Sequence, residues 1–334
     1  MKKLLVTGGA GFIGSNYVHY HGEKYPADQI VVLDKLTYAG NLPNIQHLID
    51  SAKINFIQGD ITNLEFLREL FQREKFDLVL NFAAETHVDR SIVDPGIFVQ
   101  TNIVGTHNLL LASRESNVKR YHQISTDEVY GDLGEGSSNF FTENTPLAPN
   151  CPYAAAKAAA DLLVRSYYVT YGFPATISRC SNNYGPYQFP EKLLPFFFKL
   201  ASEGKPLPIY GDGKNVRDWL FVLDHCRAID MIASSDRHGE IFNIGGHNEK
   251  NNLEIARHIL NFLGKDEAAI RFVEDRKAHD RRYAIDAGKI KKELGWEPTV
   301  RFEDGMKRTF QWYTDNQDWV KATESRLLNF IKET

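Results

Sequence analysis

Short runs of apolar residues alternate with amphipathic segments over the first 170 residues. The runs at 3–7, 30–34, 54–58, 78–82 and 120–125 predict buried strands, and the segments at 13–20, 65–73, 102–115 and 153–171 predict helices. Continuous apolar runs, each followed by a helix, are typical of a parallel sheet that is covered on both faces. Because the crossovers between parallel strands are right-handed, the pattern predicts a doubly wound, Rossmann-type α/β sheet.

The pattern changes beyond residue 185, where Pro, Gly and Asn interrupt the chain more often. We expect residues 1–185 to form the Rossmann domain, and 186–218 with 247–334 to form a smaller α/β lobe that binds substrate. The segment 219–246 contains the apolar run 241–244 and is expected to return to the first domain. Residues 134–152 predict a long loop, which inside a compact domain is usually functional.

Composition excludes several classes of protein. With 43% hydrophobic and 25% charged residues among 334, the chain is typical of a soluble globular protein. The net charge of −4 offers no basic surplus for nucleic acid. Cys151, Cys180 and Cys226 match neither a disulfide framework nor a zinc spacing, so we expect no metal. The apolar run 4–6 is too short for a signal peptide, and no stretch approaches a membrane span. We therefore expect a cytoplasmic location and no membrane contact.

Three glycines follow the first predicted strand and open the first predicted helix. Gly8, Gly11 and Gly14 allow a tight turn and a close approach of the backbone to a pyrophosphate. Unpaired N–H groups at the start of the helix then face the anion. The surrounding strand and helix make this a dinucleotide-binding motif rather than a chance spacing.

Asp34 ends the second strand, 20 residues after Gly14, where a carboxylate accepts hydrogen bonds from ribose hydroxyls. Since a carboxylate repels a 2′-phosphate, Asp34 favours NAD over NADP, although the adjacent Lys35 leaves NADP open. Asp60 follows the third strand, where it is either an adenine contact or a plain turn residue.

A second group of residues carries acid–base chemistry. Thr126, Asp127 and Glu128 end the fifth strand, at the sheet edge where α/β proteins bind ligands. Tyr153 and Lys157 lie one turn apart at the start of the following helix, so their side chains share a face. We expect Lys157 to lower the pKa of the Tyr153 phenol from about 10 and so provide a phenolate base.

With these motifs in place, the chain resembles the extended short-chain dehydrogenase/reductase family, which acts on nucleotide sugars. The Thr-Asp-Glu triplet narrows the resemblance to the nucleotide-sugar 4,6-dehydratases, most closely those acting on dTDP-glucose. The matching strings cover nearly the whole chain and include 8–14, 82–89, 153–157, 179–186, 190–193, 209–219 and 279–286.

The resemblance implies an NAD-dependent hydro-lyase that converts dTDP-glucose to dTDP-4-keto-6-deoxyglucose. Tyr153 would take the proton of the C4 hydroxyl during oxidation, and Thr126 would bond the C4 oxygen. Glu128 would remove the C5 proton and Asp127 would protonate the departing C6 hydroxide. Two alternatives are a dehydratase for a UDP-, CDP- or GDP-linked sugar and a nucleotide-sugar 4-epimerase. An epimerase has no use for the Asp–Glu pair, and a non-catalytic sensor would be expected to lose Tyr153 or Lys157.

Further site residues follow from the same resemblance. Cofactor-binding residues would be Gly8, Gly11, Phe12, Ile13, Gly14, Asp34, Lys35, Thr37, Asp60, Ile61, Phe82, Ala83, Ala84, Thr101, Tyr153, Lys157 and Asn183. Substrate-binding residues would be Thr86, Thr126, Asn182, Lys192, Leu193, Pro208, Tyr210, Arg217, Asn252, Arg276, His279 and Tyr283.

The resemblance also suggests a homodimer held by the helices at 98–115 and 153–171. Their apolar residues, among them Leu109, Leu110, Leu111, Leu162, Leu163 and Val164, exceed what one buried face needs. In the competing interpretation, the second lobe covers these residues and the protein is a monomer.

Overall fold

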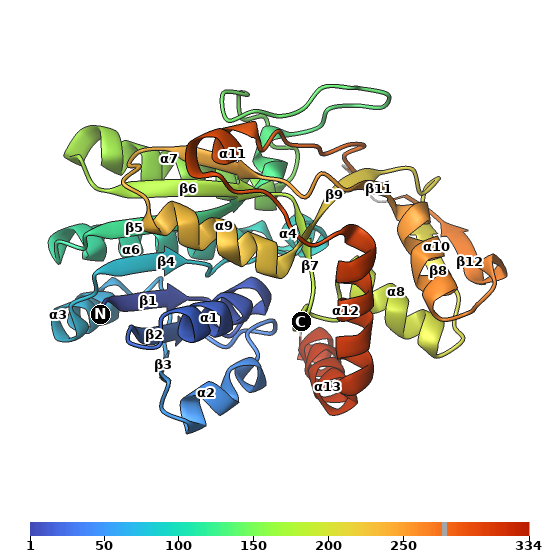
Figure 1. The fold of residues 1–334 in the computed structure, drawn as a ribbon, viewed down its shortest axis with the longest axis horizontal. Coiled ribbons are helices and arrows are strands. Elements are labelled where there is room, and N and C mark those ends of the chain that lie inside the picture. The colour runs from blue at the N-terminus through green and yellow to red at the C-terminus, as the bar shows by residue number, and fades with distance from the viewer. Residues whose placement is uncertain (276–278, 334) are drawn as a thin grey trace.

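A seven-stranded parallel sheet forms the centre of the protein (Figure 1). The computed structural model describes residues 1–275 and 279–333. The strand order is β10-β6-β5-β4-β1-β2-β3, and every neighbouring pair is parallel. These strands are β1 (Lys3–Thr7), β2 (Gln29–Asp34), β3 (Ile54–Gln58), β4 (Leu78–Asn81), β5 (Arg120–Thr126), β6 (Ala175–Cys180) and β10 (Ile241–Ile244). The predicted doubly wound α/β fold is confirmed.

Two helix layers cover the sheet. Helices α3 (Leu64–Glu74), α6 (Thr106–Glu115) and α7 (Pro152–Tyr171) share a core with Leu5, whereas α1 (Phe12–Lys24) and α9 (Val222–Ser234) share a core with Leu4. Successive side chains of a strand point to opposite faces, so both faces of β1 must be apolar. This requirement explains the uninterrupted apolar runs in the sequence.

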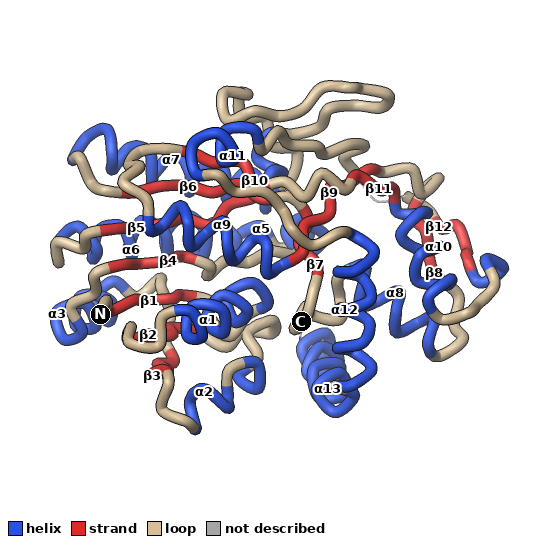
Figure 2. The backbone as a smooth tube through the Cα atoms, viewed as in Figure 1, coloured by secondary structure: helices blue, strands red, loops and turns tan. Residues whose placement is uncertain are grey.

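Shorter helices connect these elements along the first half of the chain. They are η1 (Leu42–Asn44), α2 (Gln46–Asp50), α4 (Val88–Val93), α5 (Pro95–Phe98), the π-helical segment η2 (Val99–Gly105) and η3 (Asp127–Tyr130). Between η3 and α7, residues 131–151 form the predicted long loop, drawn in tan in Figure 2.

The second half of the chain builds a separate core beside the carboxyl ends of the strands. Its strands are β7 (Asn182–Tyr184), β8 (Leu207–Tyr210), β9 (Val216–Phe221), β11 (Glu249–Asn251) and β12 (Ile270–Val273), paired as β11-β9-β7 and β12-β8. Its helices are α8 (Leu193–Ser202), α10 (Asn252–Phe262), η4 (Glu267–Ala269), α11 (Gly288–Leu294), α12 (Phe302–Asp315) and α13 (Gln317–Glu333). Over the described ranges, no helix is long and apolar enough to cross a membrane.

The segment 219–246 contributes to the central sheet. Strand β10 pairs with β6, and α9 packs beside α1. One element of the expected lobe also packs on the sheet, because Ile290 of α11 shares a core with Phe242 of β10. The division of the chain into two domains remains a prediction.

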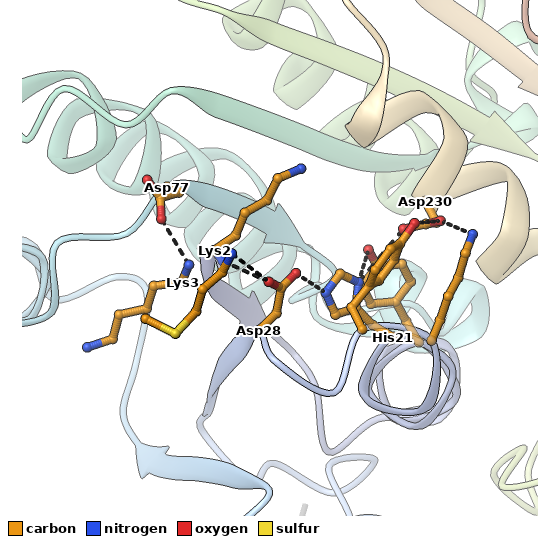
Figure 3. A network of polar contacts seen from close by, with 10 residues as sticks. Lys2, Lys3, His21, Asp28, Asp77 and Asp230 are labelled. Carbon is orange, nitrogen blue, oxygen red and sulfur yellow. Dashed lines mark hydrogen bonds and ion pairs between the residues drawn. The ribbon is translucent and has the colours of Figure 1, made fainter.

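A network of hydrogen bonds and ion pairs lies at the amino ends of the central strands (Figure 3). Asp28 accepts from the backbone N–H of Lys2 at 2.7 Å and lies 3.2 Å from His21 Nε2. On the other side of α1, Lys24 Nζ forms a 2.7 Å ion pair with Asp230 of α9. The network joins α1 and α9 to the residues that precede β1 and β2, at the amino ends of the strands, whereas the site lies at their carboxyl ends.

Candidate active site

The glycine-rich turn is packed against the loop after β4. Gly8 has φ +68°, and a Cβ added there would lie 2.6 Å from the backbone nitrogen of Ala83. A Cβ on Gly14 would lie 2.3 Å from the carbonyl oxygen of Gly8. Helix α1 is capped by Gly11, which has no side chain to bond the first-turn N–H groups. Glycines leave the backbone of this turn open to a ligand, and the first N–H groups of α1 have no side-chain acceptor. Both features suit the binding of a pyrophosphate.

Asp34 ends β2 inside the same cavity. Its carboxylate accepts from the N–H of Ala10 at 3.0 Å and of Leu36 at 2.8 Å, which fixes its orientation. Burial raises the pKa of Asp34. Lys35 is held by an ion pair with Asp60, at 2.7 Å between Nζ and Oδ2. The cation that left NADP open therefore already has an anionic partner, which favours NAD.

Thr126, Asp127 and Glu128 lie where β5 runs into η3. Thr126 Oγ1 donates to Asp127 Oδ1 at 3.3 Å, and the N–H of Glu128 donates to Thr126 Oγ1 at 3.3 Å. Burial raises the pKa of Asp127 well above its ordinary value, and the Glu128 charge adds to the effect. Among the described residues, Asp127 Oδ2 is buried without a hydrogen-bond partner. Asp127 is thus placed to keep a proton and to give it to a ligand.

Tyr153 and Lys157 begin α7, whose first turn contains Pro152 and is capped by the Cys151 sulfur. Both side chains are buried, and Lys157 Nζ donates to the carbonyl oxygen of Ile124 at 2.6 Å. Burial raises the pKa of the Tyr153 phenol well above its ordinary value, and the Glu128 charge acts in the same direction. Burial also lowers the pKa of Lys157. The expected lowering of the Tyr153 pKa by Lys157 is not present in the chain alone.

These groups line one cavity at the carboxyl edge of the sheet. The cavity includes the catalytic candidates and every residue assigned to the cofactor, from the turn Gly8–Gly14 and Asp34, Lys35, Thr37, Asp60 and Ile61 to Phe82, Ala83, Ala84, Thr101 and Asn183. A second cavity shares Thr86, Glu128, Asn182, Glu191 and Lys192 with the first, so the two are continuous. Leu193, Pro208, Tyr210, Arg217, Asn252, His279 and Tyr283 line the second cavity. Arg276 lies outside the described residues.

The second cavity contains fixed cationic groups. Arg217 is 7% exposed, donates to the carbonyl oxygen of Asp280 at 2.9 Å, and lies 4.2 Å from the centre of the Tyr283 ring. Lys192 Nζ donates to the carbonyl oxygen of Thr86 at 3.2 Å, where the two cavities meet. Two cationic side chains that line one cavity and are each bonded to a backbone carbonyl suit a diphosphate.

Sequence reasoning missed a cluster between the two cavities. Tyr38 Oη donates to Glu191 Oε1 at 2.9 Å, and the Arg90 guanidinium lies 4.3 Å from the centre of the Tyr38 ring. Arg90 also pairs with Glu85 at 3.3 Å. Glu191 stands within the matching string 190–193, which could have identified it. Glu85 lies in the matching string 82–89 in the same way, whereas no local pattern connects Tyr38 with Arg90.

Within residues 1–275 and 279–333, no group of three or more His, Cys, Asp or Glu side chains is arranged to hold a metal ion. The three cysteines are all buried, and none forms a disulfide with another.

Comparison with known proteins identifies the relatives of this chain. Residues 5–309 match the family model described as GDP-mannose 4,6 dehydratase. A dTDP-glucose 4,6-dehydratase from Neisseria meningitidis is 50% identical over 96% of this chain and 95% of its own length. The crystal structure of DesIV, a dTDP-glucose 4,6-dehydratase from Streptomyces venezuelae with NAD and TYD bound, has a TM-score of 0.92 and 47% identity, covering 96% of this chain and 99% of DesIV.

A UDP-glucose 4-epimerase from Thermotoga maritima has the same fold, with a TM-score of 0.87, but is 29% identical over 94% of this chain and 99% of its own. The identity to the dehydratases is much higher and extends over nearly the full length of both chains. The chain therefore belongs to the dTDP-glucose 4,6-dehydratases.

Proposed function

We propose that the protein converts dTDP-glucose to dTDP-4-keto-6-deoxyglucose by loss of water, using NAD. The observation that carries this proposal is the position of Asp127, Glu128 and Tyr153 in one cavity that opens into the Arg217 cavity. The bare glycine turn, the buried Asp34 and the ion-paired Lys35 fit NAD. When bound, NAD supplies a hydride acceptor for C4 oxidation and returns the hydride to C6.

Tyr153 and Thr126 act on the C4 hydroxyl. Removal of the hydroxyl proton needs a base within hydrogen-bond reach, and Tyr153 and Thr126 both line the cofactor cavity. Thr126 orients the C4 oxygen. Since burial disfavours the Tyr153 phenolate in the chain alone, Tyr153 needs positive charge nearby. The buried Lys157, one turn along α7, would supply part of it, and an oxidised nicotinamide would supply more when NAD is bound.

Asp127 and Glu128 carry out the elimination. Once C4 is a ketone, the C5 proton is acidic, and Glu128 removes it and returns it to C5 when C6 is reduced. Asp127 donates its proton to the leaving C6 oxygen. Its buried, unpartnered Oδ2 and raised pKa suit a group that must hold a proton until the leaving group needs it.

Arg217 and Lys192 bind the diphosphate, and Asn182 and Asn252 supply hydrogen bonds from the same cavity. Arg217 is buried and Lys192 is partly exposed, and both are already bonded to backbone carbonyl oxygens, so they lose little freedom on binding an anion.

The activity is tested by incubating the purified protein with dTDP-glucose and measuring the alkali-induced absorbance of a 4-keto-6-deoxy sugar. UDP-, CDP- and GDP-glucose serve as matched substrates. We expect product from dTDP-glucose at the highest kcat/KM. Faster turnover of another nucleotide sugar would refute the base assignment, and epimerised sugar without 4-keto product would refute the dehydratase.

We also propose a homodimer, supported by the outer face of α7. Leu162 and Val169, two turns apart on one face of the helix, are 57% and 63% exposed, which is unusual for apolar side chains. A two-fold axis can cover such a face with its own copy. Three of the other apolar residues that we expected at the dimer interface are not available for it. Leu109, Leu110 and Val164 are buried against the sheet.

A further inference from the structure

Helix α13 reaches from the second lobe to the loop that follows β2. Figure 1 shows it below α12, on the side toward α1 and α2. Arg326 Nη2 donates to the carbonyl oxygens of Leu36 and Thr37, at 2.9 and 2.6 Å. About two turns earlier in the helix, Trp319 Nε1 donates to Asn44 Oδ1 at 2.7 Å. The helix thus bonds both ends of the loop 36–44.

This loop forms the wall of the cofactor cavity beside Asp34, where the adenosine ribose belongs. Lys35, Thr37, Ala39 and Gly40 line the cavity. Leu36 has φ +57°, a left-handed conformation that a leucine keeps only where other contacts hold it. Its N–H donates to Asp34 Oδ1 at 2.8 Å, and its carbonyl accepts from Arg326. Arg326 therefore closes the turn that orients Asp34.

The second contact leads to the glycine-rich turn. Asn44 is 1% exposed, and its Nδ2 donates to the carbonyl oxygen of Ala10 at 2.9 Å. The N–H of Asn41 donates to the same oxygen at 2.9 Å. Asn44 Oδ1 accepts from Trp319 Nε1 at 2.7 Å and from Asn41 Nδ2 at 3.0 Å, and these two bonds together set which side of the Asn44 carboxamide faces Ala10. The indole thereby supports the turn on which the pyrophosphate rests.

We propose that Arg326 and Trp319 are positioning residues that hold the adenosine end of the cofactor site in its binding conformation and so slow the release of NAD. The proposal rests on the proposed use of NAD. In that reaction NAD is reduced and reoxidised within one cycle, so the enzyme has no need to release it between turnovers. The match to the family model ends at residue 309, so both residues lie beyond the matched part of the chain. Their positioning role follows from the contacts that they make in this chain.

The test uses the full-length enzyme loaded with NAD. Arg326→Ala removes both carbonyl contacts, and Trp319→Phe removes the indole N–H while keeping a ring against Trp312 and Tyr187. Lys321→Ala is the matched control, since it removes an exposed cation from the same helix. After rapid removal of free cofactor, the NAD that remains bound is measured over time, together with the melting temperature and steady-state kinetics.

We expect Arg326→Ala to release NAD about tenfold faster, the effect of losing about one charge-assisted hydrogen bond. Trp319→Phe should also accelerate release, Arg326→Lys should restore part of the retention, and Lys321→Ala should change nothing. At saturating NAD, kcat and the KM for dTDP-glucose should stay unchanged, because the catalytic groups are untouched.

Release at the unaltered rate in both Arg326→Ala and Trp319→Phe would overturn the inference. So would a fall in kcat at saturating NAD that follows a lower melting temperature, since this would indicate general destabilisation. If the unaltered enzyme binds no NAD at all, the proposed function itself is wrong. If the variants release NAD at the unaltered rate, only the positioning role of Arg326 and Trp319 is wrong.

Discussion

Asp127→Asn should separate oxidation of the sugar from loss of its C6 oxygen. The side chain keeps its shape, and the amide oxygen can still accept the 3.3 Å hydrogen bond from Thr126 Oγ1. What disappears is the proton that the buried carboxyl holds. Asparagine has none to give to a leaving hydroxide, so oxidation at C4 should continue while elimination slows.

The magnitude follows from the role of a single general acid. Such a group contributes ~10²–10⁴-fold, which corresponds to ~2.7–5.4 kcal/mol of barrier. Because burial and the Glu128 charge disfavour the Asp127 carboxylate, replacing it with a neutral amide should not lower the melting temperature. In the unaltered enzyme, elimination needs protonated Asp127, so its rate should fall as pH rises through the raised pKa. That limb should vanish in Asp127→Asn.

The assay is stopped-flow absorbance of reduced nicotinamide after mixing with dTDP-glucose. Asp127→Asn should give a signal that rises and persists, whereas Tyr153→Phe should give none because the C4 hydroxyl keeps its proton. Asp77→Asn, at the amino end of β4 and paired with Lys119, controls for an Asp-to-Asn change away from the cavity. Equally small losses in the Asp127 and Tyr153 variants, with no persistent signal in either, would contradict the assigned roles.

Three further predictions concern binding, stability and assembly. Arg217→Ala should raise the KM for dTDP-glucose ~10–100-fold with a smaller change in kcat, as steady-state kinetics would show, because a charge-assisted contact to the diphosphate is lost. Burial lowers the pKa of His225 from 6.5 to about 3. Between these two pH values the His225 side chain is protonated in the unfolded chain but neutral in the folded one. The unfolding free energy should therefore fall by ~1.4 kcal/mol for each pH unit below 6.5. Denaturant titrations at pH 7, 6 and 5 give the unfolding free energy at each pH. Its dependence on pH should be shallower by that amount in His225→Gln, and an unchanged pH dependence would contradict the prediction. Leu162→Glu should reduce the mass found by light scattering from about twice 38.0 kDa to 38.0 kDa, whereas Leu223→Glu on α9 should not; a mass of 38.0 kDa for the unaltered protein would exclude the dimer.

The sheet and the cofactor motif could be predicted because their determinants are local. An apolar run such as 3–7 predicts a buried strand by itself, and Gly8, Gly11 and Gly14 place a phosphate turn directly after it. Tyr153 and Lys157 are likewise one turn apart on one helix. In each case the residues that cooperate are neighbours in the sequence, so their spacing carries the information.

Contacts between distant segments could not be predicted this way. Tyr38, Arg90 and Glu191 meet only because the loop after β2, helix α4 and the segment before α8 face one another. Leu110 and Leu162 have similar helical surroundings in the sequence, yet one is fully buried and the other is 57% exposed. Which helix face meets the sheet depends on the packing of the whole layer rather than on the apolar content of one segment.

The position of β10 at the edge of the sheet has a consequence for synthesis of the chain on the ribosome. Strand β6 ends at Cys180, whereas its outer partner β10 begins at Ile241. At ~5–20 residues per second, translation of the intervening residues takes roughly 3–12 s. During that time the backbone of β6 has an open hydrogen-bonding edge, which is the kind of edge that pairs with other chains. Chains that stop between these strands should therefore be the ones that aggregate or recruit chaperones.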